Sequence, residues 1–146
     1  MSAPFELLHP QGLRIARGLA SAQLMGSHAA LAEKRSEPRD GWATHRLHPW
    51  VDGGLRLGVD LMFRHGLLAE CHLWHDDDAL YGSSWDDWSE RRERQRARAL
   101  RDWLAAHGSP VGVYGWGEIW AHYEPRSGFG GGGVRYADAG DLLSEQ

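Results

Sequence analysis

The sequence predicts an α+β fold in which an antiparallel sheet of about five strands packs against one long helix. Residues 55–63 alternate apolar and polar side chains, the period-two pattern of a half-buried strand. Residues 85–107 carry the start and stop signals of a helix, and residues 111–136 carry the alternation and central turn of a hairpin. The chain has 146 residues, of which 42% are hydrophobic and 25% charged, the composition of a soluble globular domain. We therefore predict a single domain, 1–146.

The N-terminal part is predicted to contain a helix. Apolar residues between positions 11 and 34 fall near the helical period, although Gly18 and Gly26 lower the helix propensity of this segment. The two ends of the chain, residues 1–8 and 138–146, are expected to fray because they lack a strong pattern that would tie them to the fold.

Three strand-like segments then predict an antiparallel meander. The first, residues 42–50, is ended by Pro49 and a turn, and the second covers residues 55–64. The turn His65-Gly66 leads into the third, residues 67–74. Alternation in the third strand places Leu67, Ala69, Cys71 and Leu73 on one face, and Leu68, Glu70, His72 and Trp74 on the other.

The strongest predicted helix covers residues 85–107. Ser84 is a suitable N-cap, and Gly108 followed by Pro110 is a typical helix stop. Trp85, Trp88, Ala99, Leu100, Trp103 and Leu104 mark the face of this helix that is expected to pack on the sheet.

A terminal hairpin is predicted from residues 111–123, a turn at residues 124–128 and a last strand near residues 132–136. The glycine run 130–133 follows the turn and lacks the Lys-Ser/Thr pair of a phosphate-binding loop. We interpret this run as a flexible edge of the hairpin.

Histidines and aspartates around position 75 raise the hypothesis of a small metal-dependent enzyme. His72 and His75, with the acidic loop that follows them, offer the ligands that zinc or non-haem iron uses. Residues three apart on a strand point to opposite faces, however, so these two histidines are not expected to share one ion. Cys71 lies among apolar neighbours and is expected to be a buried thiol. The sequence therefore predicts no metal, no cofactor and no catalytic residue, with the enzyme kept as an alternative.

A second alternative is nucleic-acid binding through the arginine-rich helix segment 91–101. Arginines with tryptophans nearby are able to contact phosphates and bases. Acidic residues interleave with these arginines, and the chain has a formal net charge of -4. Both features favour a solvated, salt-bridged surface over a nucleic-acid interface.

Eight tryptophans are more than a domain of this size can bury deeply. Trp88 and Trp103 lie on the predicted packing face, whereas partly exposed tryptophans are common in binding hot spots. An acidic and aromatic patch is suited to a basic protein partner. The predicted partner-binding residues are Asp76, Asp77, Asp78, Trp85, Asp86 and Asp87. A helix start packed on a sheet edge, with its acids left in water, would account for the same residues.

The expected location is the cytoplasm, without membrane contact. No uncharged stretch is long and apolar enough to span a bilayer, and residues 1–8 do not have the pattern of a secretory signal. The sequence does not indicate an oligomeric state.

The order of elements resembles that of small immunity proteins from bacterial polymorphic and contact-dependent toxin systems. The resemblance covers about two-thirds of the chain. Its motifs are Phe63-x-x-Gly66-Leu67-Leu68, Trp85-x-x-Trp88, Trp103-Leu104, Trp116-Gly117-x-Ile119 and Tyr123-Glu124-Pro125-Arg126-Ser127-Gly128. The resemblance implies a non-catalytic protein that occludes a cognate toxin, whose surface is expected to be basic. This is the leading functional hypothesis from the sequence.

Overall fold

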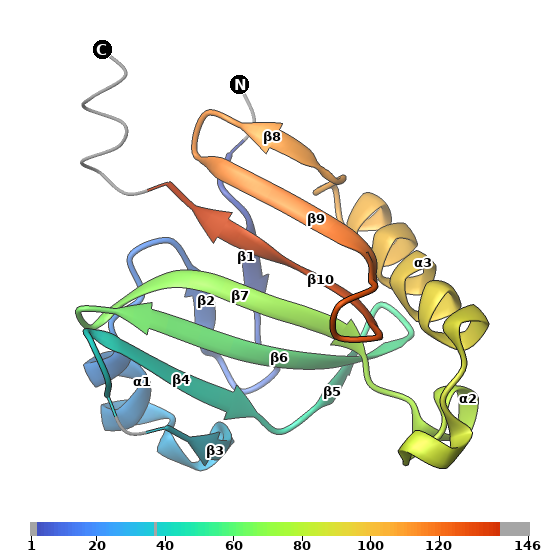
Figure 1. The fold of residues 1–146 in the computed structure, drawn as a ribbon. Helices are drawn as coiled ribbons and strands as arrows, with labels where there is room; N and C mark the ends of the chain where they lie inside the picture. Colours follow the sequence, from blue (N-terminus) through green and yellow to red (C-terminus); the bar gives the residue numbers. More distant parts are fainter. Residues whose placement is uncertain (1–2, 37, 138–146) are drawn as a thin grey trace.

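An eight-stranded antiparallel sheet and a separate two-stranded hairpin are the main β-elements of the computed structural model, which describes residues 3–36 and 38–137 (Figure 1). The large sheet has the order β3-β4-β6-β7-β10-β9-β8, and β5 pairs with β6 beside the end of β4. Its strands are β3 (Ala32–Arg35), β4 (Trp42–Leu47), β5 (Trp50–Asp52), β6 (Leu55–Arg64), β7 (Leu67–His75), β8 (Gly112–Tyr114), β9 (Gly117–Glu124) and β10 (Phe129–Tyr136).

The predicted α+β class, the meander and the terminal hairpin are confirmed, whereas the predicted number of strands is too small. The meander is β4-β6-β7, and the hairpin is β9-β10 with the short strand β8 added at its edge. The predicted first strand is interrupted at His48 and Pro49, since proline has no N–H group to donate to a neighbouring strand. The chain then resumes as β5 on the same side of β6.

The predicted helix at residues 11–34 is wrong over most of its length. The structure instead has β1 (Glu6–Leu8), β2 (Arg14–Ala16), the short helix α1 (Ser21–Ser27), a 3-10 helix (Ala29–Leu31) and β3. Gly12 and Gly18 have φ values of 94° and 89°. These values are not helical, so a continuous helix cannot pass through either residue.

Residues 5–8 belong to the fold, so the prediction that the start of the chain frays is wrong there. Phe5 and Leu7 are 2% and 1% exposed, and Leu7 pairs with Ile15 in the β1-β2 hairpin. Residues 1–2 and the predicted frayed tail 138–146 lie outside the described residues.

A β-bulge changes which side chains of β7 share a face, so the predicted faces are wrong at the start of this strand. The register shifts between Met62 and Phe63, so that Phe63 pairs with Leu68. Leu68 is therefore 4% exposed and Leu67 is 55% exposed, the reverse of the predicted assignment. Cys71 is buried as predicted, and Leu73, which was predicted to share its face, is buried as well.

The long helix starts later than predicted. Helix α3 (Glu90–Ala106) is capped by Ser89, whose side chain accepts the N–H of Arg92 at 3.1 Å. Before it come helix α2 (Asp78–Tyr81) and a 3-10 helix (Trp85–Asp87). Trp85 is 76% exposed and does not pack on the sheet as predicted. Leu100, Trp103 and Leu104 do face the core.

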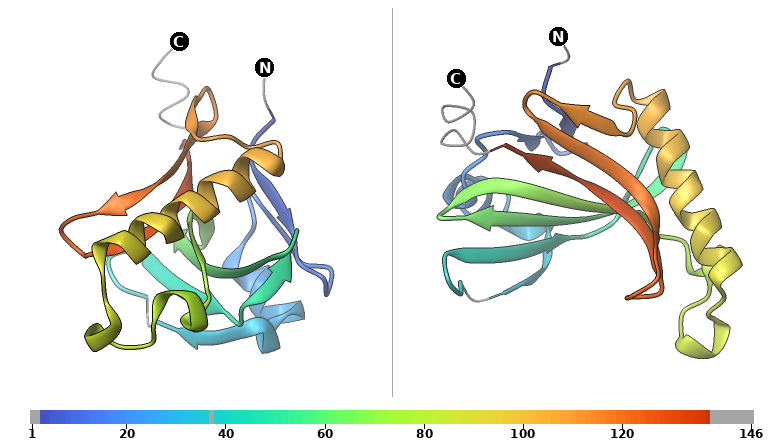
Figure 2. Two further views of the ribbon diagram at one scale, coloured as in Figure 1. Left: turned by 90° about the vertical axis from the view of Figure 1, so that its right-hand side faces the viewer. Right: turned by 45° about the horizontal axis from the view of Figure 1, so that its top comes forward.

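The glycine run 130–133 is part of an interior strand, so its interpretation as a flexible edge is wrong. Strand β10 lies between β7 and β9, and α3 crosses these strands closely (Figure 2). A Cβ atom at Gly130 would overlap the carbonyl of Glu93, and one at Gly132 would lie 2.9 Å from a methyl group of Leu100. Glycine at these positions lets the helix approach the sheet. The main core lies on this face, with contributions from β6, α3 and the β1-β2 hairpin.

Candidate functional site

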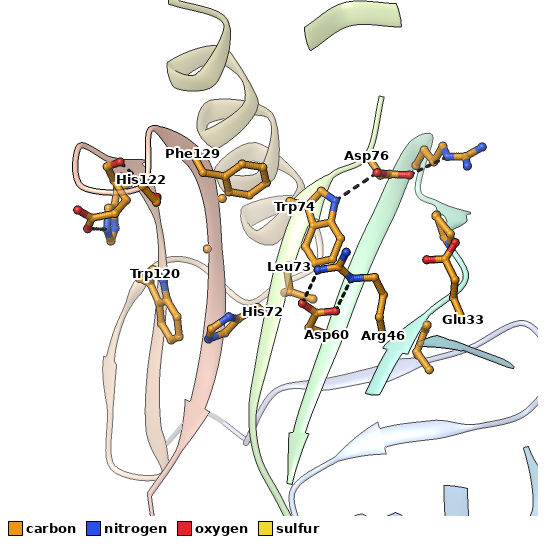
Figure 3. A pocket seen from close by; sticks show the side chains of 17 residues that line it. Glu33, Arg46, Asp60, His72, Leu73, Trp74, Asp76, Trp120, His122 and Phe129 are labelled. Carbon is orange, nitrogen blue, oxygen red and sulfur yellow. Dashed lines mark hydrogen bonds and ion pairs between the residues drawn. The ribbon is translucent and has the colours of Figure 1, made fainter. Parts of the chain in front are cut away.

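The other face of the sheet carries a groove with a volume of about 570 Å³ (Figure 3). Gly130 and Gly132 point toward α3, so Gly131 and Gly133 point to the groove side. The side chains that define the groove come from β3, β4, β6, β7, β9, β10 and the residues next to them. They are Glu33, Arg46, Arg56, Asp60, His72, Trp74, Asp76, Trp120, His122, Glu124 and Phe129.

Aromatic rings in the groove lie over glycines. Trp120 pairs across the strands with Gly133, and a Cβ atom at this glycine would lie 2.7 Å from the indole ring. The ring of Phe129 is similarly close to Gly131, at 3.0 Å. Because β10 lacks side chains here, the aromatic rings form walls above a floor of backbone.

The same relationship recurs on the next pair of strands. Trp74 pairs with Gly58, and the indole ring occupies the space that a side chain at Gly58 would need. The guanidinium of Arg46 lies 5.2 Å from the centroid of this ring. Trp74 is thus held between a glycine and a cation, which fixes the position of this wall.

Ion pairs hold the charged side chains at one end of the groove. Arg46 donates from Nε and Nη2 to the two carboxylate oxygens of Asp60, at 2.8 and 3.0 Å, and this hydrogen bonding raises the pKa of Arg46. Asp76 accepts hydrogen bonds from Trp74 Nε1 and Arg56 Nε, both at 3.2 Å. These contacts come from three strands, β4, β6 and β7, and from the residue after β7, so the arrangement depends on the pairing of these strands.

The opposite end of the groove contains two histidines and Glu124. His122 Nε2 lies 3.8 Å from the Glu124 carboxylate, which also accepts the N–H of Arg126 at 2.9 Å. His72 lies beside Trp120, with 5.9 Å between the ring centroids, and its Nε2 is 3.5 Å from Glu70. The hydrogen bonds from His72 and Arg135 lower the pKa of the Glu70 carboxyl group.

The structure divides the six predicted partner-binding residues between two places. Asp76 lies in the groove, and the other five belong to residues 77–88, which we call the tip. The tip extends beyond one end of the sheet, below the N-terminal end of α3 in Figure 1. The predicted set is therefore only partly brought together.

Within the tip, some of these side chains have structural contacts and others face solvent. Asp77 caps α2 by accepting the N–H of Leu80 at 3.1 Å, and Asp78 is the first residue of that helix. Asp87 accepts a hydrogen bond from Ser84 Oγ at 3.4 Å. The side chains of Asp78, Trp85, Asp86 and Asp87 are exposed.

The tip and the groove form a continuous surface through the turn between β9 and β10. A smaller hollow of about 260 Å³ lies in the tip, and Ser127 and Phe129 line both this hollow and the groove. Trp88 Nε1 donates to the carbonyl of Gly128 at 2.6 Å, which joins the tip to the same turn.

A buried ion pair in α3 contacts both the tip and the start of β10, next to the turn between β9 and β10. Glu93 and Arg96 of α3 are 3% and 8% exposed, and Glu93 Oε1 accepts the N–H of Gly130 at 3.0 Å. The Arg96 guanidinium lies 4.5 Å from the ring centroid of Tyr81 and 4.9 Å from that of Phe129. Sequence reasoning placed Arg96 among the solvated arginines. Its i,i+3 spacing from Glu93, in line with the apolar face of the helix, was the available signal.

The ligands of the alternative metal enzyme are separated. His72 faces the groove, whereas His75 Nδ1 lies 2.7 Å from the hydroxyl oxygen of Tyr81, near Arg96. Within residues 3–36 and 38–137, no group of three or more His, Cys, Asp or Glu side chains is arranged to hold a metal ion. Cys71 is buried, and burial raises the pKa of its thiol.

The arginines of the alternative nucleic-acid interface also lie in different environments. Arg94 pairs with Glu90 at 3.1 Å and stacks on Tyr123, and Arg92 donates to the carbonyl of Asp87. Arg96 is buried. Arg92 and Arg96 are therefore engaged within the fold, whereas Arg91, Arg94, Arg98 and Arg101 are exposed, with the acidic residues Glu90 and Asp102 also exposed on this helix.

Comparison with known proteins finds no matching family model and no match among curated proteins or solved structures. In the described part of the chain, no helix is both long enough and apolar enough to cross a membrane.

Proposed function

We propose that this chain is a non-catalytic binding protein that neutralises a cognate bacterial toxin by occluding it. The proposed docking surface is the tip together with the adjoining end of the groove. The observation that carries the proposal is the combination of exposed aromatic side chains and unbroken acidic charge in the tip.

The charge of this segment has one sign along the sequence, while Arg92 donates to the carbonyl of Asp87 and Arg96 lines the tip hollow from α3. From Asp76 to Glu90 the sequence contains six acidic residues and no Lys, Arg or His. A surface of this kind attracts a basic partner and accelerates the encounter with it. The toxin is therefore expected to present a basic surface at the contact.

Exposed apolar side chains supply the contact area. Trp85 is 76% exposed, Leu80 54%, Phe129 40% and Trp88 39%. Large aromatic residues surrounded by polar groups are enriched among the residues that contribute most to binding energy. Burying Trp85 against a partner would remove a large apolar surface from water.

The tip is held in place before any partner binds. Asp77 caps α2, Trp88 is hydrogen bonded to Gly128, and a side chain at Gly82 would overlap that of Asp87. A surface that is already ordered loses less conformational entropy on binding. Occlusion by a rigid surface requires no reacting group in the chain.

Two segments that carry the resemblance to immunity proteins meet at this surface. The hydrogen bond from Trp88 to Gly128 joins Trp85-x-x-Trp88 to the end of Tyr123–Gly128. This contact supports the proposal because both motifs contribute to the same face.

The decisive experiment is a tagged pull-down from the source bacterium, with identification of the co-eluting protein and an assay of its toxicity. We expect a stoichiometric partner whose toxicity is lost in the complex. The triple variant Trp85→Ala, Asp86→Asn, Asp87→Asn should weaken this complex by at least about tenfold, because it removes an aromatic contact and two charges.

The matched control removes the same charge and one exposed apolar side chain elsewhere, through Asp40→Asn, Asp102→Asn and Val113→Ala. All three positions are exposed and lie outside the tip. This variant should bind as the parent does. A partner that is not toxic, or equal binding by the triple variant and the parent, would contradict the proposal.

A further inference from the structure

We propose that the groove receives an arginine side chain from the basic partner, so that one guanidinium lies between its aromatic walls. This inference rests on the proposed function for the identity of the partner. The groove itself, however, belongs to this chain and is testable without the toxin.

The shape of the groove fits a long, flat side chain. Its floor includes the backbone of Gly131 and Gly132, which carry no side chains, and its walls include Trp120 and Phe129. Figure 3 shows Trp120 and Trp74 on the two sides of this floor, with Phe129 near one end. A planar guanidinium stacks on aromatic rings, and its stem can lie along apolar surface.

The charge of the groove also favours a cation. Four acidic residues line it against two arginines, Arg46 and Arg56. Both arginines are already paired with Asp60 and Asp76. Of the remaining two acidic residues, Glu124 lies 3.8 Å from His122 Nε2, and Glu33 contributes to the raised pKa of Arg46. Neither forms an ion pair with an arginine at hydrogen-bond distance among the described residues, so both carboxylates are able to accept hydrogen bonds from an incoming cation.

The groove already contains an example of the proposed contact. Arg46 lies over Trp74 while its Nε and Nη2 donate to the carboxylate of Asp60. Arg96 and Arg135 likewise lie 4.9 and 5.7 Å from the ring centroids of Phe129 and Trp120. A partner arginine near Glu124 would add a further guanidinium to one of these rings, with the carboxylate as acceptor. Arginine is preferred over lysine at such a site because it supplies both interactions at once.

The test uses the intact chain and two small probes, N-acetyl-argininamide and N-acetyl-citrullinamide. The probes have nearly the same shape and differ in charge. Backbone amide NMR signals of Gly131, Gly132 and Gly133, and the indole N–H signals of Trp74 and Trp120, would report binding at the groove. We expect saturable shifts with the arginine probe, at a dissociation constant on the order of millimolar, and at least about fivefold weaker binding of the citrulline probe.

Two double variants separate a specific role of the groove acids from a general charge effect. Glu33→Gln with Glu124→Gln should weaken binding of the arginine probe at least about fivefold, since two of the negative charges that line the groove are lost. Glu6→Gln with Glu90→Gln makes the same change in net charge at exposed positions outside the groove and should leave binding unchanged.

Equal shifts with both probes, shifts outside the groove only, or equal weakening by both double variants would overturn the inference. A toxin that binds the chain when the arginine probe does not would remove this inference and leave the proposed function intact. Binding of the arginine probe in the groove, with no toxin found as partner, would support this inference and leave the proposed function without support.

Discussion

Arg96 and Glu93 lie one helical turn apart in α3 and form a buried ion pair, with Arg96 Nε 3.2 Å from Glu93 Oε1. The pair connects three elements that are distant in sequence. Glu93 holds Gly130 of β10, and Arg96 donates to the carbonyl of His75 at the end of β7 at 3.3 Å. The base of the tip is thereby fixed to both the helix and the sheet.

Replacing Arg96 by methionine should lower the free energy of unfolding by about 3 kcal/mol, because it leaves the Glu93 carboxylate buried without its partner. Urea denaturation followed by tryptophan fluorescence would measure the loss. The control is Arg94→Met, whose pair with Glu90 is more than half exposed at both side chains. Its loss should be at most about 1 kcal/mol. Equal losses in the two variants would mean that the buried pair has no special role in the fold.

The glycines of β10 lead to a second prediction. Gly130→Ala should destabilise the protein by at least about 2 kcal/mol, because the added Cβ atom would overlap the Glu93 carbonyl and push α3 from the sheet. Gly26→Ala is the matched control, since Gly26 lies in α1 with nothing within 4 Å of an added Cβ atom. That change should be neutral or stabilising by up to about 1 kcal/mol. Thermal unfolding of both variants would provide the comparison.

The start of α3 gives a third prediction, which also tests the correction to the sequence-based helix boundary. Ser89→Ala should cost about 1 kcal/mol because it removes the hydrogen bond that caps the helix. Ser84→Ala should cost less, since Ser84 makes no side-chain cap hydrogen bond to the 3-10 helix that follows it. A larger loss at Ser84, measured by chemical denaturation, would favour the helix boundary predicted from the sequence.

These positions show which parts of the fold were accessible to sequence reasoning. The strand β6 was predicted because the alternation from Leu55 to Arg64 is a local pattern. The start of α3 was predicted wrongly because Ser84 and Ser89 are both suitable N-caps, and the local sequence does not distinguish them. In the structure the helix begins after Ser89, and Trp88, just before it, is hydrogen bonded to Gly128, which is 40 residues away. The N-terminal hairpin was missed because strands of three residues carry little periodicity.

The groove could not be derived from the sequence because it depends on pairing between β7 and β10. That pairing brings Leu73 opposite Gly132, although the two residues are 59 positions apart. A local signal did exist in the alternation of aromatic and small residues from Val111 to Tyr123, followed by the glycine run of β10. Acidic and exposed residues of the tip were easier to identify, since charge and chain position alone indicated them.

The last prediction concerns pH. Burial lowers the pKa values of His9, His45 and His75 below the ordinary value of 6.5, with a nearby Arg35 adding to the effect at His45. Each of these histidines binds a proton more readily in the unfolded chain than in the folded protein. Their contribution to the free energy of unfolding is therefore fully present above about pH 6.5. This contribution is lost as the pH falls from 6.5 toward the lowered folded-state pKa values. Urea midpoints should therefore be lower at pH 5.5 than at pH 7.5.

His45 allows the source of this pH dependence to be isolated. Its ring is 7% exposed and packs edge-on against Phe63, with 5.4 Å between the ring centroids. His45→Gln should reduce the difference between the two midpoints, because one protonation site with different affinity in the folded and unfolded states is removed. The same substitution at the exposed His48 should leave that difference as it is in the parent. A midpoint that rises toward pH 5.5, or an equal effect of the two substitutions, would show that buried histidines do not control acid sensitivity here.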